Sequence, residues 1–370
     1  MNRRSFLSVA PAAGGAASVS FGQASGPAGG KRAGSGAAKA RMVVGCQRGP
    51  TSDEMLAYFK RHGVEHICGH PAASGEKGYW DRDDLMRLRE RVDRHGIRLM
   101  MIEPEMSSAY ITRARRASIM LGQDPDRDRQ IDLVCKTIRA AAEAGIPALK
   151  YNLTVLGVVR TASATGRGGV KLSTWKYSEA KQDPPLTEAG PMPAERMWER
   201  ITYFLERVIP VAVGHRIRMA CHPHDPGMPP RGFRGVDRVL GTVAGLRKLL
   251  SIKESPYHGL NFCQGTVAEM LADPGKEIYA VIREFAQRKK IFNVHFRNIR
   301  GRRDDFVETF PDEGDVDMWR ALLEYKRAGY DGMLMPDHMP AHPDDPGSRQ
   351  AFAYGYGYIR AMIQAAEALG

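Results

Sequence analysis

Eight short apolar runs alternate along the chain with segments whose apolar residues recur at helical spacing. The runs cover residues 42–46, 65–68, 97–102, 148–152, 217–222, 259–263, 291–297 and 332–336. The helical segments cover 52–61, 81–95, 126–144, 195–213, 236–250, 267–288, 316–328 and 350–369. This alternation predicts an α/β fold of parallel strands, a (β/α)8 TIM barrel. A doubly wound open sheet is the alternative, but no Gly-x-Gly-x-x-Gly turn follows the first run.

The N-terminal 40 residues have a different composition from the rest. Arg3 and Arg4 precede a weakly apolar, Ala- and Gly-rich stretch, and small residues suited to cleavage follow it. We therefore expect a twin-arginine export signal at 1–24, with a disordered basic tail as the alternative. The composition of residues 25–40 indicates a flexible linker, and 41–370 should form the barrel. The expected location is the periplasm or the cell exterior.

The composition excludes several classes of partner. Lys and Arg number 54 against 42 Asp and Glu, a net charge of +12, but they are scattered rather than gathered in a stripe with aromatics. We therefore expect no nucleic acid as a partner. No segment approaches ~18 continuous apolar residues, which argues against membrane insertion. The expected partner is a small molecule, and a homo-oligomer is compatible with the sequence.

Each of the last four apolar runs ends within two residues of a side chain able to bind a metal ion. These side chains are His222, Cys263, His295 and Asp337, at intervals of 41, 32 and 42 residues. Taken singly, a cysteine is more often an apolar filler and a histidine a hydrogen-bonded polar residue. Successive strand ends of a barrel converge on one face, however, so the four should meet around one point. Two imidazoles, a thiolate and a carboxylate suit divalent Mn, Zn, Co, Ni or Fe.

Other polar residues follow the same runs. Neighbouring side chains of a strand point to opposite faces, so we expect Asp337 to bind the ion and His338, beyond the strand, to face the substrate as an acid or base. The residues predicted to contact the substrate or support the site are Tyr151, Asn152, Arg160, His224, Asp225 and Arg297. The long segment 153–193 follows the fourth run, and is interpreted as a lid, a substrate loop or a decorative insertion.

Seven short motifs occur in a fixed order between about Met42 and Gly370. They are Gly145-Ile-Pro-Ala-Leu-Lys-Tyr-Asn152, Arg160-Thr161, Cys221-His-Pro-His-Asp-Pro226, Leu260-Asn-Phe-Cys-Gln-Gly265, Val294-His-Phe-Arg-Asn298, Gly314-Asp-Val-Asp-Met318 and Met335-Pro-Asp-His338. Together they resemble the mannonate dehydratase family. The resemblance implies a xylose-isomerase-like TIM barrel and a hydro-lyase that converts D-mannonate to 2-keto-3-deoxy-D-gluconate with a divalent ion, typically Mn²⁺.

The resemblance also implies roles for particular residues. His222, Cys263, His295 and Asp337 fall on the metal ligands of the family, and His338 on its catalytic histidine. The catalytic tyrosine of the family has three candidates here, Tyr354, Tyr356 and Tyr358, of which Tyr354 is taken as the prediction. Loss of the proton α to a carboxylate builds enediolate charge that a bound cation stabilises, while a second group protonates the departing 3-hydroxyl.

The chain departs from the family pattern near the substrate. His224 stands where an acidic residue is usual, Val158 and Val159 stand where Asp-Trp is usual, and Met335 replaces an arginine able to clamp a carboxylate. These changes indicate a divergent member. A metal-dependent isomerase, epimerase or lyase acting on another sugar or keto-sugar is the first alternative. A non-catalytic carbohydrate-binding protein is the second, and the retained ligands and His338 argue against it.

Overall fold

The computed structural model describes residues 41–181, 183–228 and 232–369. The export signal predicted at 1–24 and the linker predicted at 25–40 lie outside these residues. Among the residues described, no helix combines the length and the apolar character needed to cross a bilayer.

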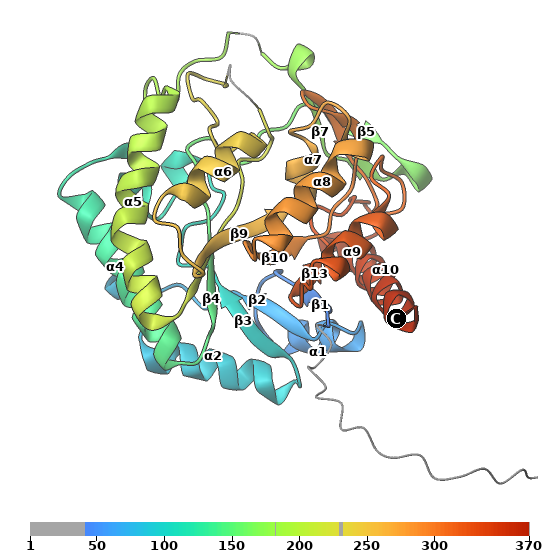
Figure 1. Ribbon diagram of the computed structural model, residues 1–370, viewed down its shortest axis with the longest axis horizontal. Helices are drawn as coiled ribbons and strands as arrows, with labels where there is room; N and C mark the ends of the chain where they lie inside the picture. The colour runs from blue at the N-terminus through green and yellow to red at the C-terminus, as the bar shows by residue number, and fades with distance from the viewer. Residues whose placement is uncertain (1–40, 182, 229–231, 370) are drawn as a thin grey trace, which may run out of the picture. The chain divides into compact units, whose positions relative to one another are not determined.

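Eight parallel strands close into a barrel, in the order β1-β13-β10-β9-β8-β4-β3-β2, with helices around them (Figure 1). The strands are β1 Val43–Cys46, β2 His66–Gly69, β3 Arg98–Ile102, β4 Ala148–Tyr151, β8 Arg218–Cys221, β9 His258–Cys263, β10 Ile291–His295 and β13 Met333–Met335. Each strand agrees with a predicted run to within about two residues at either end. The predicted (β/α)8 barrel is confirmed.

The helices begin where capping residues predict. Ser52, Asp81, Thr242 and Asp317 each accept a hydrogen bond from the backbone amide three residues later, which satisfies a free amide of the first turn. The helices are α1 Asp53–Arg61, α2 Arg82–Arg94, α3 Ala117–Leu121, α4 Asp126–Glu143, α5 Ala194–His215, α6 Val243–Ser251, α7 Gln264–Ala268, α8 Pro274–Gln287, α9 Met318–Arg327 and α10 Arg349–Ala368.

Two helix predictions need correction, and one helix was not predicted. The helix expected over 236–250 begins only at Val243, because the Thr242 cap starts it there. The helix expected over 267–288 is two helices, α7 and α8, because Pro274 is placed in the first turn of a new helix. The short α3 was not predicted at all, since five residues are too few to show helical spacing.

Strand alternation separates two apolar cores. One lies between the strands and the helices and holds most of the buried apolar residues. The other fills the inside of the barrel and consists of Val43, Cys68, Met101, Ala148, Ala220, Phe292, Met333 and Met335. On most of these strands, side chains two positions further along point to the same interior, toward the carboxyl ends of the strands. On β10 the register shifts between Ile291 and Asn293, so Phe292 belongs to the inner core and Val294 to the outer one. That end of the barrel is where polar residues replace apolar ones.

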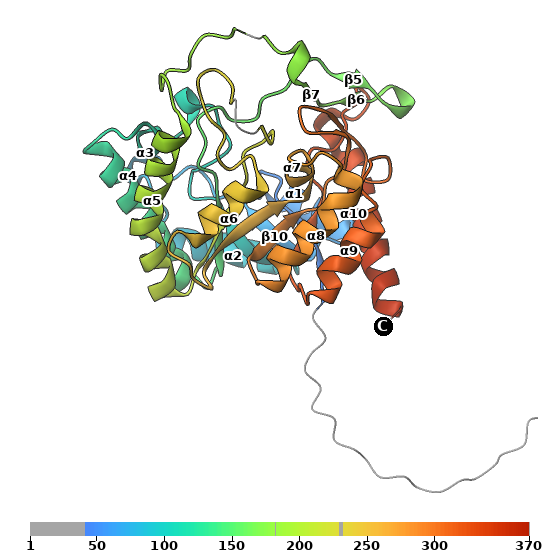
Figure 2. The same cartoon turned by 45° about the horizontal axis from the view of Figure 1, so that its top comes forward.

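The segment 153–193 is structured rather than a plain loop. It carries β5 Ala164–Thr165, β6 Lys171–Leu172 and β7 Thr174–Lys176, and lies at the top of the view in Figure 2. The chain after β10 forms a hairpin of β11 Ile299–Arg302 and β12 Asp305–Glu308. β7 pairs with β12 in antiparallel register, with Phe306 opposite Trp175. This pairing brings two segments that are far apart in sequence to the same end of the barrel.

Candidate active site

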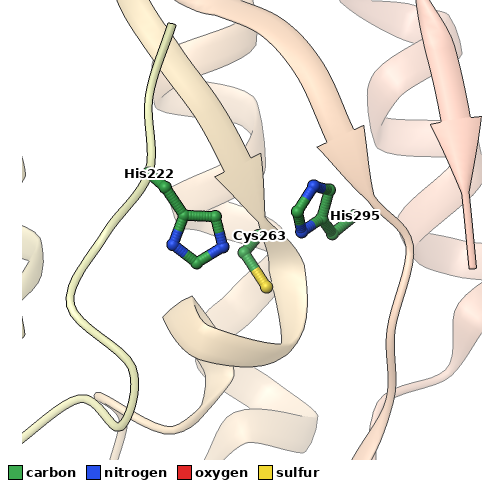
Figure 3. Close-up of side chains that lie close together, drawn as sticks. All are labelled: His222, Cys263 and His295. Carbon is green, nitrogen blue, oxygen red and sulfur yellow. The ribbon is translucent and has the colours of Figure 1, made fainter. Parts of the chain in front are cut away.

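Three of the four predicted ligands converge on one point. His222 directly follows β8, Cys263 ends β9 and His295 ends β10. One nitrogen of each imidazole and the Sγ of Cys263 all lie within 4.8 Å of one another. Figure 3 shows the three side chains turned toward each other. All three are buried, so the donor atoms are held away from bulk water.

Hydrogen bonds orient both imidazole rings. Nδ1 of His222 lies 2.6 Å from the carbonyl oxygen of Pro223 and donates to it, which leaves Nε2 as the nitrogen with a free lone pair. The side-chain amide of Asn261 lies 3.0 Å from Nε2 of His295 and turns Nδ1 of that ring toward Asp337. Partners of this kind hold the rings of metal-binding histidines in place.

Asp337 joins the cluster as its fourth member. Its Oδ2 lies 3.3 Å from Nδ1 of His295 and 4.0 Å from Sγ of Cys263. The Nε2 amide of Gln47 donates to Oδ1 at 3.1 Å and orients the carboxylate. Burial opposes ionisation, but the nearby His338, His295 and Arg297 outweigh it, and the pKa of Asp337 falls well below its usual range. The side chain is therefore a carboxylate.

Cys263 is held as a thiolate. The hydroxyl of Thr266 donates to its Sγ at 3.1 Å, and an NH2 group of Arg297 lies 3.4 Å away. Burial alone would raise the pKa of the thiol, but Arg297 and the two histidines outweigh it and lower the pKa well below the ordinary value. A thiolate is the form in which cysteine binds metal ions.

These four residues fit a divalent metal ion. They offer two imidazole nitrogens, one thiolate and one carboxylate, a donor set that first-row divalent ions accept. Among the described residues, Nδ1 of His295 is a fully buried nitrogen that makes no well-aligned hydrogen bond. Such an orphan is costly unless a ligand satisfies it. His222, Cys263, His295 and Asp337 are therefore the residues that would hold the ion.

His338 stands beside this cluster. β13 ends at Met335, and the backbone of His338 has a left-handed φ of 46°, so the alternation of a strand no longer separates its side chain from that of Asp337. Nδ1 of His338 lies 2.8 Å from Oε1 of Glu308, and Nε2 lies 3.8 Å from Oδ2 of Asp337. Burial disfavours the imidazolium, but Asp337 and Glu308 outweigh it and raise the pKa of His338 to about 10. His338 therefore carries a proton at neutral pH.

A second group of potential ligands, Asp225, Glu308 and His338, is also close enough to surround an ion. Two guanidinium groups already occupy it. Arg160 pairs with Asp225 at 2.6 Å and with Glu308, and Arg297 pairs with Asp225 at 3.1 Å and with Glu308. The charge that a second metal would neutralise is already neutralised, so we interpret this group as a buried ion-pair network that supports His338.

Comparison with known proteins assigns the family. The sequence model of the D-mannonate dehydratase (UxuA) family matches residues 186–370, half of the chain. These residues include all four cluster ligands and His338. The chain belongs to the D-mannonate dehydratase family. It is therefore an enzyme of the hydro-lyase class, in a family that dehydrates a sugar acid.

Individual proteins agree with this family. Mannonate dehydratase 2 of Halalkalibacterium halodurans is 29% identical in an alignment of length 319 that covers 78% of this chain and 88% of that protein. The crystal structure of mannonate dehydratase from Streptococcus suis serotype2 has a TM-score of 0.74 at 23% identity, covering 89% of this chain and 96% of that one. A xylose isomerase domain protein from Planctomyces limnophilus has a TM-score of 0.55 at 14% identity, covering 88% and 97%. The fold is thus that of the xylose-isomerase-like TIM barrels.

The side chains of two predicted substrate contacts, Tyr151 and Asn152, lie away from the ligand cluster. The ring of Tyr151 is fully buried against Phe204 of α5, because successive residues of β4 alternate between the inside and the outside of the barrel. Asn152 is buried as well, and its side-chain amide donates to the carbonyl of Met106 at 3.2 Å. Both residues hold the chain after β4 in place rather than line the site.

The predicted catalytic Tyr354 also needs correction. It lies on α10, is 39% exposed, and its ring contacts those of Phe310 and Tyr358. Its hydroxyl interacts with Arg167 and Asp312. Within the described residues, none of its observed contacts involves a cluster ligand or His338. The structure therefore assigns Tyr354 to the outer rim of the barrel.

His224 is a structural residue and not a substrate contact. It is 3% exposed, its Nε2 lies 2.7 Å from the carbonyl of Leu153, and its Nδ1 accepts from the backbone amide of Leu240 at 3.3 Å. One imidazole thus ties together the loops after β4 and β8. Burial, helped by the charge of Arg238, lowers the pKa of His224 to about 3.

This lowered pKa makes a prediction about acid stability. Between pH 6.5 and about 3 the unfolded chain binds a proton at His224 that the folded chain does not, so the free energy of unfolding should fall as the pH falls, by at most about 1.4 kcal/mol per pH unit from this residue. In the His224→Gln variant this part of the slope should be absent. Urea unfolding at several pH values measures it.

A matched control is His95→Gln, because His95 is only partly buried and pairs with the exposed Asp53. We also expect His224→Gln to destabilise the fold by about 1–3 kcal/mol at pH 7, since it disturbs two buried hydrogen bonds, with little change in KM. A large rise in KM with unchanged stability would show that His224 contacts the substrate after all.

Several residues of the site were not predicted from the sequence. Glu308 orients His338, Gln47 orients Asp337, Thr266 donates to Cys263, and Asn261 orients His295. Strand alternation was the available signal for Asn261 and Gln47, because each lies two residues from an inward-facing position of its strand. Glu308 lies on a hairpin outside the barrel strands, where no periodicity marks it.

Proposed function

We propose that this enzyme dehydrates D-mannonate to 2-keto-3-deoxy-D-gluconate and depends on a divalent metal ion, with Mn²⁺ as the expected native ion. The observation that carries the proposal is the convergence of His222, Cys263, His295 and Asp337, with His338 directly beside them. The names of the relatives support D-mannonate as the substrate, since the two mannonate dehydratases described above each align with more than three quarters of this chain.

The reaction removes a proton from C2 of the sugar acid, which a base must accept, and a hydroxyl from C3, which an acid must protonate. A cation bound by the four ligands would stabilise the negative charge that develops next to the carboxylate. In this scheme His338 is the acid. Its protonated Nε2 faces the cluster while Glu308 holds Nδ1, so it can donate a proton to the departing 3-hydroxyl, which leaves as water.

Arg297 and Arg160 have a positioning role in this scheme. Their guanidinium groups hold Glu308 and Asp225, and through Glu308 they set the direction of the His338 ring. Arg297 is buried, and each guanidinium is already paired with at least two acidic side chains, so its charge is largely used within the protein. The predicted substrate role of these arginines is thus replaced by a supporting one.

We take a cavity beside His338 as the route by which the substrate enters. A cavity of about 450 Å³ borders His338, Glu308 and Arg160 and continues along the segment 161–174. His338 is one third exposed, the most open of the residues in the charged network. Hydroxyl-bearing residues are prominent in the lining of this cavity, which suits a polyol; they are Thr161, Ser163, Ser173 and Thr174.

The test is product formation by the purified full-length chain. The chain would be stripped with a chelator, then assayed with D-mannonate before and after addition of Mn²⁺, Zn²⁺ or Co²⁺. We expect a 2-keto-3-deoxy acid only after metal addition. If metal-bound protein yields no such product, the proposed substrate is wrong, and conversion of neutral ketoses without loss of water would identify an isomerase or epimerase.

A further inference from the structure

Lys150 is a buried cation on the inside of the barrel for which the mechanism above has no use. It lies on β4 two residues after Ala148, which belongs to the inner apolar core, so both side chains point inward. Leu149 and Tyr151, which alternate with them, belong to the outer core. The ammonium of Lys150 is therefore directed into the barrel at the carboxyl end of its strand.

The polar residues at this end of the barrel form two halves. The four ligands lie at the ends of β8, β9, β10 and β13, which are neighbours in the barrel order. The other half carries Lys150 on β4, Glu103 directly after β3 and Gln47 directly after β1. Gln47 donates to Asp337, which follows the neighbouring strand β13, at 3.1 Å, so the two halves are in contact at this edge. A molecule bound over the ligands would have Lys150 and Glu103 as its opposite wall.

The charge on Lys150 is only partly used. Its Nζ lies 3.0 Å from Oε2 of Glu103, and this carboxylate is the one hydrogen-bond partner observed for it among the described residues. An ammonium has three N–H donors, so two remain. The side chains of Lys150 and Glu103 are 11% and 19% exposed. Both residues lie at the carboxyl ends of their strands, so we take the exposed part to face the barrel mouth.

Electrostatics keep Lys150 charged. Burial disfavours the ammonium, but Glu103, Cys68 and the ligand Asp337 outweigh it and raise the pKa of Lys150 above its ordinary value. An ion pair buried at this position adds little to stability, because desolvation of both groups offsets their attraction. Stability alone therefore does not explain why a charged lysine lies at this position. The two inward residues of β13, Met333 and Met335, contribute no charge.

We propose that Lys150 binds the carboxylate of the sugar acid at the mouth of the barrel, while Glu103 holds the ammonium in position. This inference rests on the proposed function and deepens it, since it names the residue that selects an acid over a neutral sugar. Lys150 takes the task that the engaged guanidiniums of Arg160 and Arg297 cannot perform.

The experiment measures binding without turnover. D-mannonate is titrated calorimetrically into Mn²⁺-loaded His338→Ala protein, with Lys150 retained or changed to Met, and the neutral polyol D-mannitol is titrated in parallel. We expect Lys150→Met to weaken D-mannonate binding by about 10- to 100-fold, since a charge-assisted hydrogen bond is lost. Binding of D-mannitol and of Mn²⁺ should not change, and Lys150→Arg should restore part of the affinity.

Lys290→Met is the matched control. Lys290 is also a buried lysine, but it precedes β10 at the other end of the barrel, where its Nζ donates to the carbonyl of Ser255. Its replacement should leave D-mannonate binding intact.

Two results would overturn the inference. One is equal D-mannonate affinity of the His338→Ala protein with and without the Lys150→Met change, and the other is no D-mannonate binding when Lys150 is present. Kinetics of the enzyme with His338 intact separate this inference from the proposed function. If the wild-type chain forms product and Lys150→Met keeps its KM, the role of Lys150 is wrong and the proposed reaction stands. If D-mannonate binding depends on Lys150 but no product forms, the role of Lys150 stands and the proposed reaction is wrong.

Discussion

Replacing His338 with alanine is expected to lower kcat by about 10²- to 10⁴-fold, the usual contribution of a positioned acid or base. The proton on Nε2, held in place through Glu308 on Nδ1, is the proton proposed for the departing hydroxyl. Because His338 is not one of the four ligands, the Mn²⁺ content per chain should stay at the wild-type level. Steady-state kinetics with D-mannonate and metal analysis of the same sample measure both quantities.

His342→Ala is the matched control for this change. His342 lies four residues further along the same segment, is partly exposed, and contacts Asp344 instead of the cluster. Its replacement should leave kcat within about two-fold, as expected for a surface residue away from the site. A His338→Ala enzyme that keeps most of its kcat would refute the role of this histidine. Loss of bound metal in the variant would instead make His338 a ligand.

Replacing Cys263 with alanine is expected to weaken metal binding by at least about 100-fold and to abolish activity. Removal of a supporting residue already costs about 10- to 100-fold in affinity, and Cys263 supplies a ligand itself. Its thiolate is the softest donor of the set and is sustained by Thr266 and Arg297. Competition with a chelating dye measures the affinity, and a second readout is the rise in melting temperature that metal causes in the wild-type chain, which should disappear.

Cys135→Ala controls for the loss of a buried thiol. Cys135 lies on α4 in the outer core, where burial raises the pKa of its thiol to about 11 and keeps it neutral. Its replacement should cost some stability but no metal affinity. If Cys263→Ala bound the ion as tightly as the wild-type chain, the thiolate would be excluded as a ligand and the cluster would have to be reassigned.

Much of the barrel could be predicted from local patterns. Buried parallel strands are continuous apolar runs, and each ends where polar residues begin, so all eight were found close to their observed positions. The convergence of His222, Cys263, His295 and Asp337 was predicted by the same reasoning, because residues at successive strand ends of a barrel share one face. The structure then places three of them within 4.8 Å of one another and the fourth in contact.

The surroundings of the cluster were harder to predict. Tyr151 and His224 belong to the motifs, but their side chains point away from the site. Tyr151 points outward by strand alternation, and His224 bonds the backbone of two loops. Once a strand has ended, the place of a residue next to a ligand in the sequence does not show where its side chain points. Lys150 was part of a motif, yet its inward direction follows only when Ala148 is known to face the barrel interior.

The sequence by itself determined the class of fold, the position of its strands along the chain and the side chains proposed to bind the metal, because these depend on periodicity and on where apolar runs end. Only the tertiary structure decided which charges meet. Glu308 reaches His338 because β12 pairs with β7, a strand of the long segment after β4. Arg160 and Arg297 both pair with the carboxylate of Glu308. Such contacts depend on long-range pairing and packing, which no local pattern of residues records.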